Sequence, residues 1–297
     1  MQLRVFILGG TGSIGAPVLR ELVRCGHTVT ALARSDESGT KLASMGANVL
    51  KGDLRQPSQW VQHLPPLDAV VNVAGTFADD EEETDRQLLD HILPRLRYNA
   101  APVRFIYTGG CWLYGTTDGT VTTEASAFSP LPTFSWAITH IERLLATGHI
   151  WPIVIHPAMV YAVNSGVFAS MYAEAAGGRA VRVVGAETVR WPLVHHDDLA
   201  VLYRLALEQA SPGDSFIGAA ITGVSVGQIA RALSRSLSGH EEAPMIITEQ
   251  DAIAEFGSWA AGYGRDQLQS GEKARRILGW NPVHLDPLSE IARLGNA

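Results

Sequence analysis

Three glycines near the N-terminus have the spacing that a phosphate-binding turn needs. Gly10, Gly12 and Gly15 fit the pattern G-x-G-x-x-G, directly after the apolar residues 5–8 and before a segment with helical periodicity. Glycine permits the tight turn, lets a pyrophosphate approach the backbone, and lets the helix pack closely on its strand. Free N–H groups at the helix N-terminus then favour the phosphate charge. The sequence predicts a dinucleotide-binding turn made of Gly9, Gly10, Thr11, Gly12, Ser13, Ile14 and Gly15.

Arg34 stands at the expected end of the second strand, 19 positions after Gly15. An acidic residue there would hold the ribose 2′-hydroxyl of NAD(H), whereas a guanidinium suits the 2′-phosphate of NADP(H). We therefore expect NADP(H) to be the preferred coenzyme. Asp36 lies close by in the sequence and keeps NAD(H) possible. Alternatively, Arg34 is a solvated surface residue without a role in coenzyme binding.

The elements that must position these residues alternate between strands and helices in the first half of the chain. Apolar runs predict strands at 27–33, 48–54, 67–73, 103–107 and 151–156, in addition to the first at 5–8. Helical periodicity follows the glycine turn and recurs around 88–96 and 134–146. This alternation is typical of a parallel sheet covered by helices. The expected fold class is α/β, a Rossmann doubly wound parallel sheet with a smaller C-terminal part.

The expected domain division follows from the same pattern. Residues 1–160 would form the dinucleotide-binding domain, and residues from about 191 to 222 would return to it. Residues 161–190 and 223–297 would form the substrate-binding part, with two or three helices after about residue 224, one of them at 274–278.

Composition limits the classes of function. The chain has 297 residues, 46% of them hydrophobic and 18% charged, as in ordinary globular proteins. A net charge of −7 without a basic cluster argues against nucleic acid as a partner. No apolar run is long enough for a membrane span. Cys25 and Cys111 lack metal or disulfide spacing. We expect a cytoplasmic protein without a metal, as a monomer or homodimer.

Short motifs follow one another along nearly the whole chain, at residues 9–15, 52–54, 72–75, 114–115, 156–161, 194–200 and 274–280. Together they resemble the extended or atypical short-chain dehydrogenase/reductases, which are related to NAD-dependent epimerases and dehydratases. The resemblance implies that Asp53 and Leu54 contact the adenine ring, although Asp53 could also be a helix cap. It further implies contacts of Ala74 and Gly75 with the adenosine, and of Pro157, Met159 and Val160 with the nicotinamide.

The family's acid–base pair is missing from this chain. Members usually carry Tyr-x-x-x-Lys on the helix after the fifth strand, preceded by a serine or threonine that polarises the carbonyl. Alignment places Phe134 at the tyrosine position, Ile138 at the lysine position and Gly110 at the serine position. No tyrosine is followed four positions later by lysine, and no lysine occurs between residues 52 and 272.

A reductase without that pair needs a substrate that is already polarised. A ketone beside a phenol on an aromatic polyketide is such a substrate, because the phenol hydrogen-bonds the carbonyl oxygen. The protein would then mainly orient the ring system against the nicotinamide. The candidate substitute donors are Thr108, Ser135, His140, His195 and His196, with Thr108 and Ser135 preferred and His140 expected to be structural. Thr108 is also a candidate for contact with the coenzyme.

Aromatic and neighbouring residues near the strand ends suit a flat polycyclic ligand, with core packing as the alternative for each. The candidates for contact with the substrate are Gly110, Trp112, Tyr114, Phe134, Trp136, Tyr161, Trp191 and His195. The predicted function is an NAD(P)H-dependent ketoreductase acting on a bulky aromatic polyketide, similar to antibiotic-pathway ketoreductases that lack the pair. The alternatives are a nucleotide-sugar epimerase or dehydratase, and a non-catalytic NADP-binding redox sensor of the NmrA-like kind.

Overall fold

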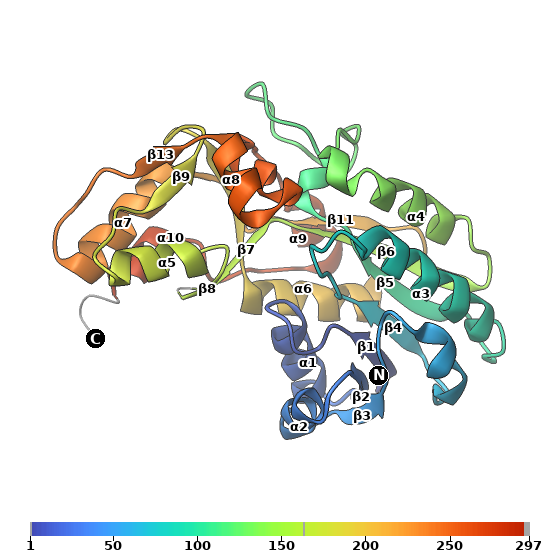
Figure 1. Cartoon of the computed structure of the whole chain (residues 1–297). Coiled ribbons are helices and arrows are strands. Elements are labelled where there is room, and N and C mark those ends of the chain that lie inside the picture. The colour runs from blue at the N-terminus through green and yellow to red at the C-terminus, as the bar shows by residue number, and fades with distance from the viewer. Residues whose placement is uncertain (1, 163, 294–297) are drawn as a thin grey trace.

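A seven-stranded parallel sheet lies at the centre of the molecule in the computed structural model, which describes residues 2–162 and 164–293 (Figure 1). Its strand order is β11-β6-β5-β4-β1-β2-β3, and every neighbouring pair is parallel. The predicted α/β Rossmann class is confirmed. The strands are β1 (Arg4–Leu8), β2 (Thr28–Ala33), β3 (Asn48–Lys51), β4 (Ala69–Asn72), β5 (Val103–Thr108), β6 (Ile150–Pro157) and β11 (Ser215–Gly218).

Helices cover both faces of this sheet, which explains why its strands are continuous apolar runs. Along β1, Val5 and Ile7 join one buried cluster while Phe6 and Leu8 join the other. The first cluster includes side chains from α1 (Gly15–Arg24), α2 (Asp36–Ser44) and α6 (His196–Gln209). The second includes side chains from α3 (Glu81–Leu96) and α4 (Trp136–Leu145).

A smaller part contains a four-stranded sheet, a two-stranded sheet and further helices around their own buried cluster (Figure 1). The larger of these sheets is ordered β12-β10-β7-β8, and β9 pairs with β13. The strands are β7 (Met159–Ala162), β8 (Ser165–Gly166), β9 (Arg182–Val184), β10 (Arg190–His195), β12 (Ile221–Ser225) and β13 (Met245–Ile247). The helices are α5 (Ala169–Ala176), α7 (Val226–Ser238), α8 (Glu249–Phe256) and α10 (Pro287–Ala292). α9 (Glu272–Leu278) returns to the main domain, where Ala274 and Leu278 pack in the same buried cluster as α6. Short 3-10 helices occur at Pro57–Gln59, Val61–His63, Cys111–Leu113, Pro132–Phe134 and Ser258–Gly264.

Several predicted elements differ from the structure. The helix expected from residue 134 begins at Trp136, because Pro132–Phe134 form a 3-10 turn. The strand expected over 48–54 ends at Lys51, and four α-helices rather than two or three follow residue 224 in the described chain. α6 and β11 lie on the main sheet, while β10 and β12 belong to the smaller one. In the residues described, no helix combines the length and apolar character that crossing a membrane requires.

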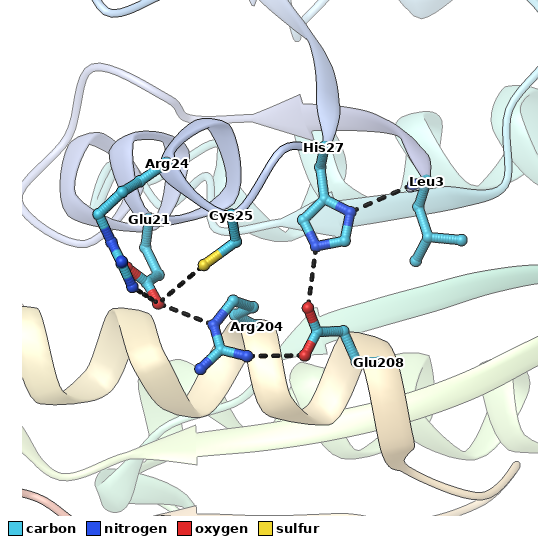
Figure 2. A network of polar contacts seen from close by, with 7 residues as sticks. All are labelled: Leu3, Glu21, Arg24, Cys25, His27, Arg204 and Glu208. Carbon is cyan, nitrogen blue, oxygen red and sulfur yellow. Dashed lines mark hydrogen bonds and ion pairs between the residues drawn. The ribbon is translucent and has the colours of Figure 1, made fainter. Parts of the chain in front are cut away.

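A chain of polar contacts joins α1 to α6 (Figure 2). Glu21 on α1 accepts a hydrogen bond from Arg204 at 2.7 Å, and Arg204 also donates to Glu208 at 2.7 Å. Glu208 contacts Nε2 of the buried His27 at 3.1 Å, and Nδ1 of that ring accepts from the backbone N–H of Leu3. The network therefore fixes α6, which packs beneath the main sheet, to the helix that begins at the glycine turn.

Replacing Arg204 by alanine is expected to lower the free energy of unfolding by about 1–3 kcal/mol, because the buried carboxylate of Glu21 loses its inner partner and keeps only Arg24. Urea unfolding measures this loss. Arg24→Ala is the matched control, since Arg24 also binds Glu21 but its side chain is 69% exposed. Equal destabilisation by both substitutions would show that the Arg204 network adds nothing beyond a surface ion pair.

Candidate functional site

A cleft of about 550 Å³ opens where β4, β5 and β6 end and where the glycine turn follows β1. Asn72, Thr108 and Pro157 close these three strands, and all three line the cleft. Ligands of open α/β sheets bind at this edge, outside the carboxyl ends of the strands. The cleft is therefore the candidate site.

Two glycines of the turn are needed for its shape. Gly9 has φ +81°, and a Cβ on it would lie 2.7 Å from the backbone of Ala74. A Cβ on Gly15 would overlap the carbonyl oxygen of Gly9. By contrast, Gly12 lines the cleft, and a Cβ there would meet only the same oxygen, at 3.4 Å. The turn thus presents bare backbone to the cleft at Gly12.

Hydrogen-bond donors at this turn are unused. Within residues 2–162 and 164–293, the backbone N–H groups of Thr11, Ser13 and Ile14 have no acceptor. Ser13 and Ile14 line the cleft beside the first residue of α1. Unpaired N–H groups at a helix N-terminus form a site for phosphate. The turn therefore fits a pyrophosphate, as the glycine spacing predicts.

Arg34 lies beyond the end of β2, exposed and outside the lining of the cleft. It makes no hydrogen bond or ion pair with other described residues. Asp36, the residue that left NAD(H) possible, is bound to Lys51 at 2.8 Å, and this bond holds the pKa of the Asp36 carboxyl below its usual range. Asp53 also lies outside the lining, and its Oδ1 accepts from the backbone N–H of Arg55, as a turn cap does.

The cleft brings together residues that the sequence analysis took from distant segments. Cofactor and substrate candidates meet in one cavity, as expected for a hydride-transfer site. The predicted residues that line it are Gly12, Ser13, Ile14, Leu54, Ala74, Gly75, Thr108, Gly110, Trp112, Phe134, Trp136, Pro157, Met159 and Val160.

Four predicted substrate residues are packed in the interior instead, which corrects the prediction. Tyr114 is 1% exposed and packs against Phe128 and His156. Tyr161 is fully buried against Phe168, the indole of Trp191 donates to the carbonyl of Tyr263, and the His195 ring stacks on His284. Since none of the four lines the cleft, the core-packing alternative holds for them.

The two hydroxyl candidates are already engaged. Thr108 Oγ1 donates to the carbonyl oxygen of Asn72 at 2.6 Å, because a carbonyl can only accept. Its 2.7 Å bond to the hydroxyl of Tyr203 is then donated by Tyr203, so Thr108 has no proton left for a ketone. Ser135 donates to the carbonyl of Pro132 and lies outside the main cleft. Ser135 instead lines a smaller hollow that adjoins the cleft, and the donor of Thr108 is occupied.

One end of the cleft is a cluster of aromatic rings. Trp112 and Phe134 were predicted, and their rings lie 5.9 Å apart and nearly parallel. Phe77, Trp259 and Tyr263 complete the cluster with centroid distances of 5.2–6.5 Å to their neighbours. Phe77 is 53% exposed and has φ +51°, which is rare for a bulky residue and common at functional sites. These rings form an apolar wall for a flat ligand.

The floor of the cleft carries a polar group that the sequence analysis missed. Asp85 on α3 accepts hydrogen bonds from Tyr107 on β5 and from His140 on α4, each at 2.7 Å. Asn72 donates to its other oxygen at 3.2 Å. Burial raises the pKa of Tyr107 well above its ordinary value, and the charges of Asp85 and Glu81 add to the increase. His140, which is expected to have a structural role, thus lies directly behind the site.

A second hollow of about 290 Å³ adjoins the first and shares Phe77, Glu81, Phe134, Trp136 and Trp259 with it. Asp79 and Glu82 add to its acidic lining. In the described part of the chain, neither hollow is lined by a lysine or an arginine. Beyond the turn, then, the site offers no cation to an anionic substrate.

Sequence comparison identifies the family to which this architecture belongs. The sequence model of the NAD dependent epimerase/dehydratase family matches residues 5–218, which include the glycine turn and the ends of β4, β5 and β6. The chain belongs to this family. Its members are generally NAD(P)-dependent.

Relatives over the whole length agree with this assignment. The chain is 31% identical to uncharacterized protein YLL056C of Saccharomyces cerevisiae, over 97% of this chain and 98% of the yeast protein. The dTDP-glucose 4,6-dehydratase DesIV of Streptomyces venezuelae, solved with NAD, has a TM-score of 0.81 at 18% identity, covering 99% and 96% of the two chains. Human epimerase family protein SDR39U1, solved with NADPH, has a TM-score of 0.79 at 19% identity, covering 99% of both. At these identities the two structures establish the common fold.

Proposed function

We propose that this family member is an NADPH-dependent ketoreductase that reduces a ketone on a bulky aromatic polyketide, as in antibiotic biosynthesis. The observation that carries the proposal is the lining of the cleft. A nucleotide-binding turn faces an aromatic wall, and that wall contains Phe134 where the family's tyrosine would stand. The angucyclinone ketoreductase of simocyclinone biosynthesis would be one enzyme of this proposed class.

Loss of the acid–base pair is tolerable for such a substrate. Acid–base catalysis typically contributes about 10²–10⁴-fold, roughly 3–5 kcal/mol of barrier. A phenol beside the ketone supplies part of this by stabilising the developing alkoxide. NADPH supplies the hydride when it is bound, and the rings of Trp112 and Phe134 orient the substrate against it.

A nucleotide-sugar epimerase or dehydratase is the second candidate, because the family contains both activities. Its substrate carries a diphosphate, which proteins usually bind with arginine or lysine. In the described residues no such side chain lines either hollow, so the lining favours a neutral or aromatic substrate. The third candidate is an NADP-binding redox sensor. It would also lack the tyrosine–lysine pair, and it would differ from a ketoreductase only in binding the coenzyme without consuming it.

Arg34 is expected to select NADP(H). Its guanidinium is free at the end of β2, and the competing carboxylate of Asp36 is bound to Lys51. Arg34→Ala should raise the dissociation constant for NADPH about 10- to 100-fold, a loss of roughly 1.4–2.8 kcal/mol, with little change for NADH. Fluorescence titration measures both constants.

Lys41→Ala is the matched control for Arg34→Ala, because it removes an exposed cation from the end of α2. It should leave both dissociation constants unchanged. If Arg34→Ala weakened NADPH and NADH equally, the arginine would not read the 2′-phosphate.

Turnover assays test the proposed function itself. Wild-type protein with NADPH and an aromatic hydroxyketone should form one equivalent of alcohol for each NADPH consumed. Binding of NADPH without consumption by any aromatic ketone would favour the sensor. Tightly held NAD with no net consumption, together with epimerisation of a nucleotide sugar, would favour the epimerase.

A further inference from the structure

The polar group on the floor of the cleft connects three elements of the main domain. Asp85 Oδ2 lies 2.7 Å from the hydroxyl oxygen of Tyr107 and 2.7 Å from Nδ1 of His140. Asp85 and Tyr107 line the cleft, whereas His140 lies behind them on α4. His140 is 6% exposed, and the ring of Trp136, which lines both hollows, packs on it at 5.1 Å.

The protons in this group can be assigned from its chemistry. An ionised carboxylate only accepts hydrogen bonds, so Tyr107 and His140 both donate to Asp85. Nδ1 of His140 therefore carries a proton, and Nε2 faces away from the carboxylate. The hydroxyl of Thr108, the other candidate at this end of β5, donates to the backbone carbonyl of Asn72, which cannot supply a proton in return. The hydroxyl of Tyr107 donates to a carboxylate, which can carry one. Tyr107 is thus the cleft-lining hydroxyl with a proton source behind it.

A purely structural network is the simpler explanation, but it fits the location less well. A buried charged group contributes little net stability compared with apolar residues of similar size. Here the carboxylate lies in the lining of the cleft, one end of which is the aromatic cluster. His140 is also on the same helix as Ile138, which occupies the position of the family's lysine, two residues earlier.

We propose that His140, Asp85 and Tyr107 form a proton-delivery chain that replaces the missing tyrosine–lysine pair. This inference rests on the proposed ketone reduction. In this inference the product oxygen receives its proton through these three side chains and not directly from water.

The step balances as follows. The carbonyl carbon gains a hydride from NADPH, the C=O π bond breaks, and its electron pair passes to oxygen. That oxygen takes the hydroxyl proton of Tyr107. The Nδ1 proton of His140 passes to the ionised carboxylate of Asp85, Asp85 gives a proton to the Tyr107 oxygen, and His140 takes a proton from water at Nε2. The sum is one ketone, one hydride and one proton from solvent giving one alcohol.

The charged side chains described next to this proton-delivery chain are a carboxylate and one ion pair. Glu81 lies one turn before Asp85 on α3, and burial raises the pKa of the Glu81 carboxyl. Farther along the same interface, Asp90 of α3 binds Arg143 of α4 at 2.7 Å.

Three substitutions test the chain: Tyr107→Phe, Asp85→Asn and His140→Gln. Each should lower kcat for ketone reduction about 100-fold, while KM and the NADPH dissociation constant change less than about threefold. The solvent deuterium isotope effect on kcat should change with each, because proton transfer then follows another route. Added imidazole should restore part of the rate of His140→Ala.

His149→Gln is the matched control for His140→Gln. His149 also donates to an oxygen of α3, the carbonyl of Leu93, but it lies outside the cleft. It should change neither kcat nor the isotope effect. Tyr263→Phe tests the other tyrosine of the cleft that could donate, and a 100-fold loss there with none in Tyr107→Phe would overturn the proposal.

A measurement on the protein without substrate separates this inference from the proposed function. The proton on Nδ1 of His140, assigned by nuclear magnetic resonance and by its loss in His140→Gln, should exchange with water much faster than the protein unfolds. Protection of that proton until global unfolding would overturn the chain, as would variants with wild-type kcat. Fast exchange in a protein that reduces no aromatic ketone would contradict the proposed function and leave the solvent-connected chain established.

Discussion

Replacing Gly15 by valine is expected to abolish NADPH binding and to lower thermal stability at the same time. A Cβ at this position would overlap the carbonyl oxygen of Gly9. Gly9 cannot move aside, because it packs so closely on Ala74 that a Cβ built on Gly9 would lie 2.7 Å from the Ala74 backbone. The turn must therefore open, and α1 loses its packing on the sheet. Fluorescence titration with NADPH and a thermal melt measure the two effects.

Gly12→Val separates coenzyme binding from folding. Its Cβ would meet only the Gly9 oxygen, at 3.4 Å, and the side chain would extend into the cleft where the pyrophosphate belongs. We expect an unchanged melting temperature and a loss of NADPH affinity of about 100-fold, which corresponds to about 2.8 kcal/mol. Wild-type affinity in Gly12→Val would place the coenzyme somewhere other than on this turn.

Trp112→Ala should produce the largest loss of substrate binding. The indole contacts the rings of Phe134, Trp259 and Tyr263, and it lies directly against Gly262. Its removal opens the centre of the aromatic wall and deprives a flat ligand of its main stacking partner. We expect KM for an aromatic ketone to rise about 30-fold, the roughly 2 kcal/mol of an interface hot spot. Steady-state kinetics at saturating NADPH give this value.

Trp151→Ala is the control for this truncation. Trp151 is partly buried beneath the guanidinium of Arg104 on the main sheet and does not line the cleft. The substitution should lower stability but leave KM unchanged. A similar rise in KM for both tryptophans would attribute the effect to general loosening of the fold rather than to the aromatic wall.

The nucleotide half of the site could be predicted because its signals are local. Gly12, Ser13 and Ile14 follow one another in the chain, and the strand ends at Asn72, Thr108 and Pro157 are brought to one edge by a parallel sheet. Helix α2 was missed since it buries only Leu42 and so has no apolar stripe. Its usable signal was the capping box of Ser35 and Ser38.

The substrate half depends on tertiary contacts that spacing does not encode. Trp112 and Tyr114 are two residues apart, yet the 3-10 turn at Cys111–Leu113 directs the first toward the cleft and the second into the core. Asp85 and Trp259 reach the site because α3 and the segment Ser258–Gly264 pack against it from distant parts of the chain. The sequence signal nearest to Asp85 is the acidic run at 79–83, a pattern that more often indicates a solvated face.

The central claim is that a coenzyme on the glycine turn faces an aromatic cleft without the tyrosine–lysine pair and still reduces a ketone there. The most direct measurement is a stoichiometric turnover of purified wild-type protein with NADPH and an aromatic hydroxyketone, following coenzyme absorbance and product together. We predict saturable NADPH binding and equal amounts of NADPH consumed and alcohol formed. Failure to retain either NADPH or NADH in the preceding titration would contradict the account at its first step.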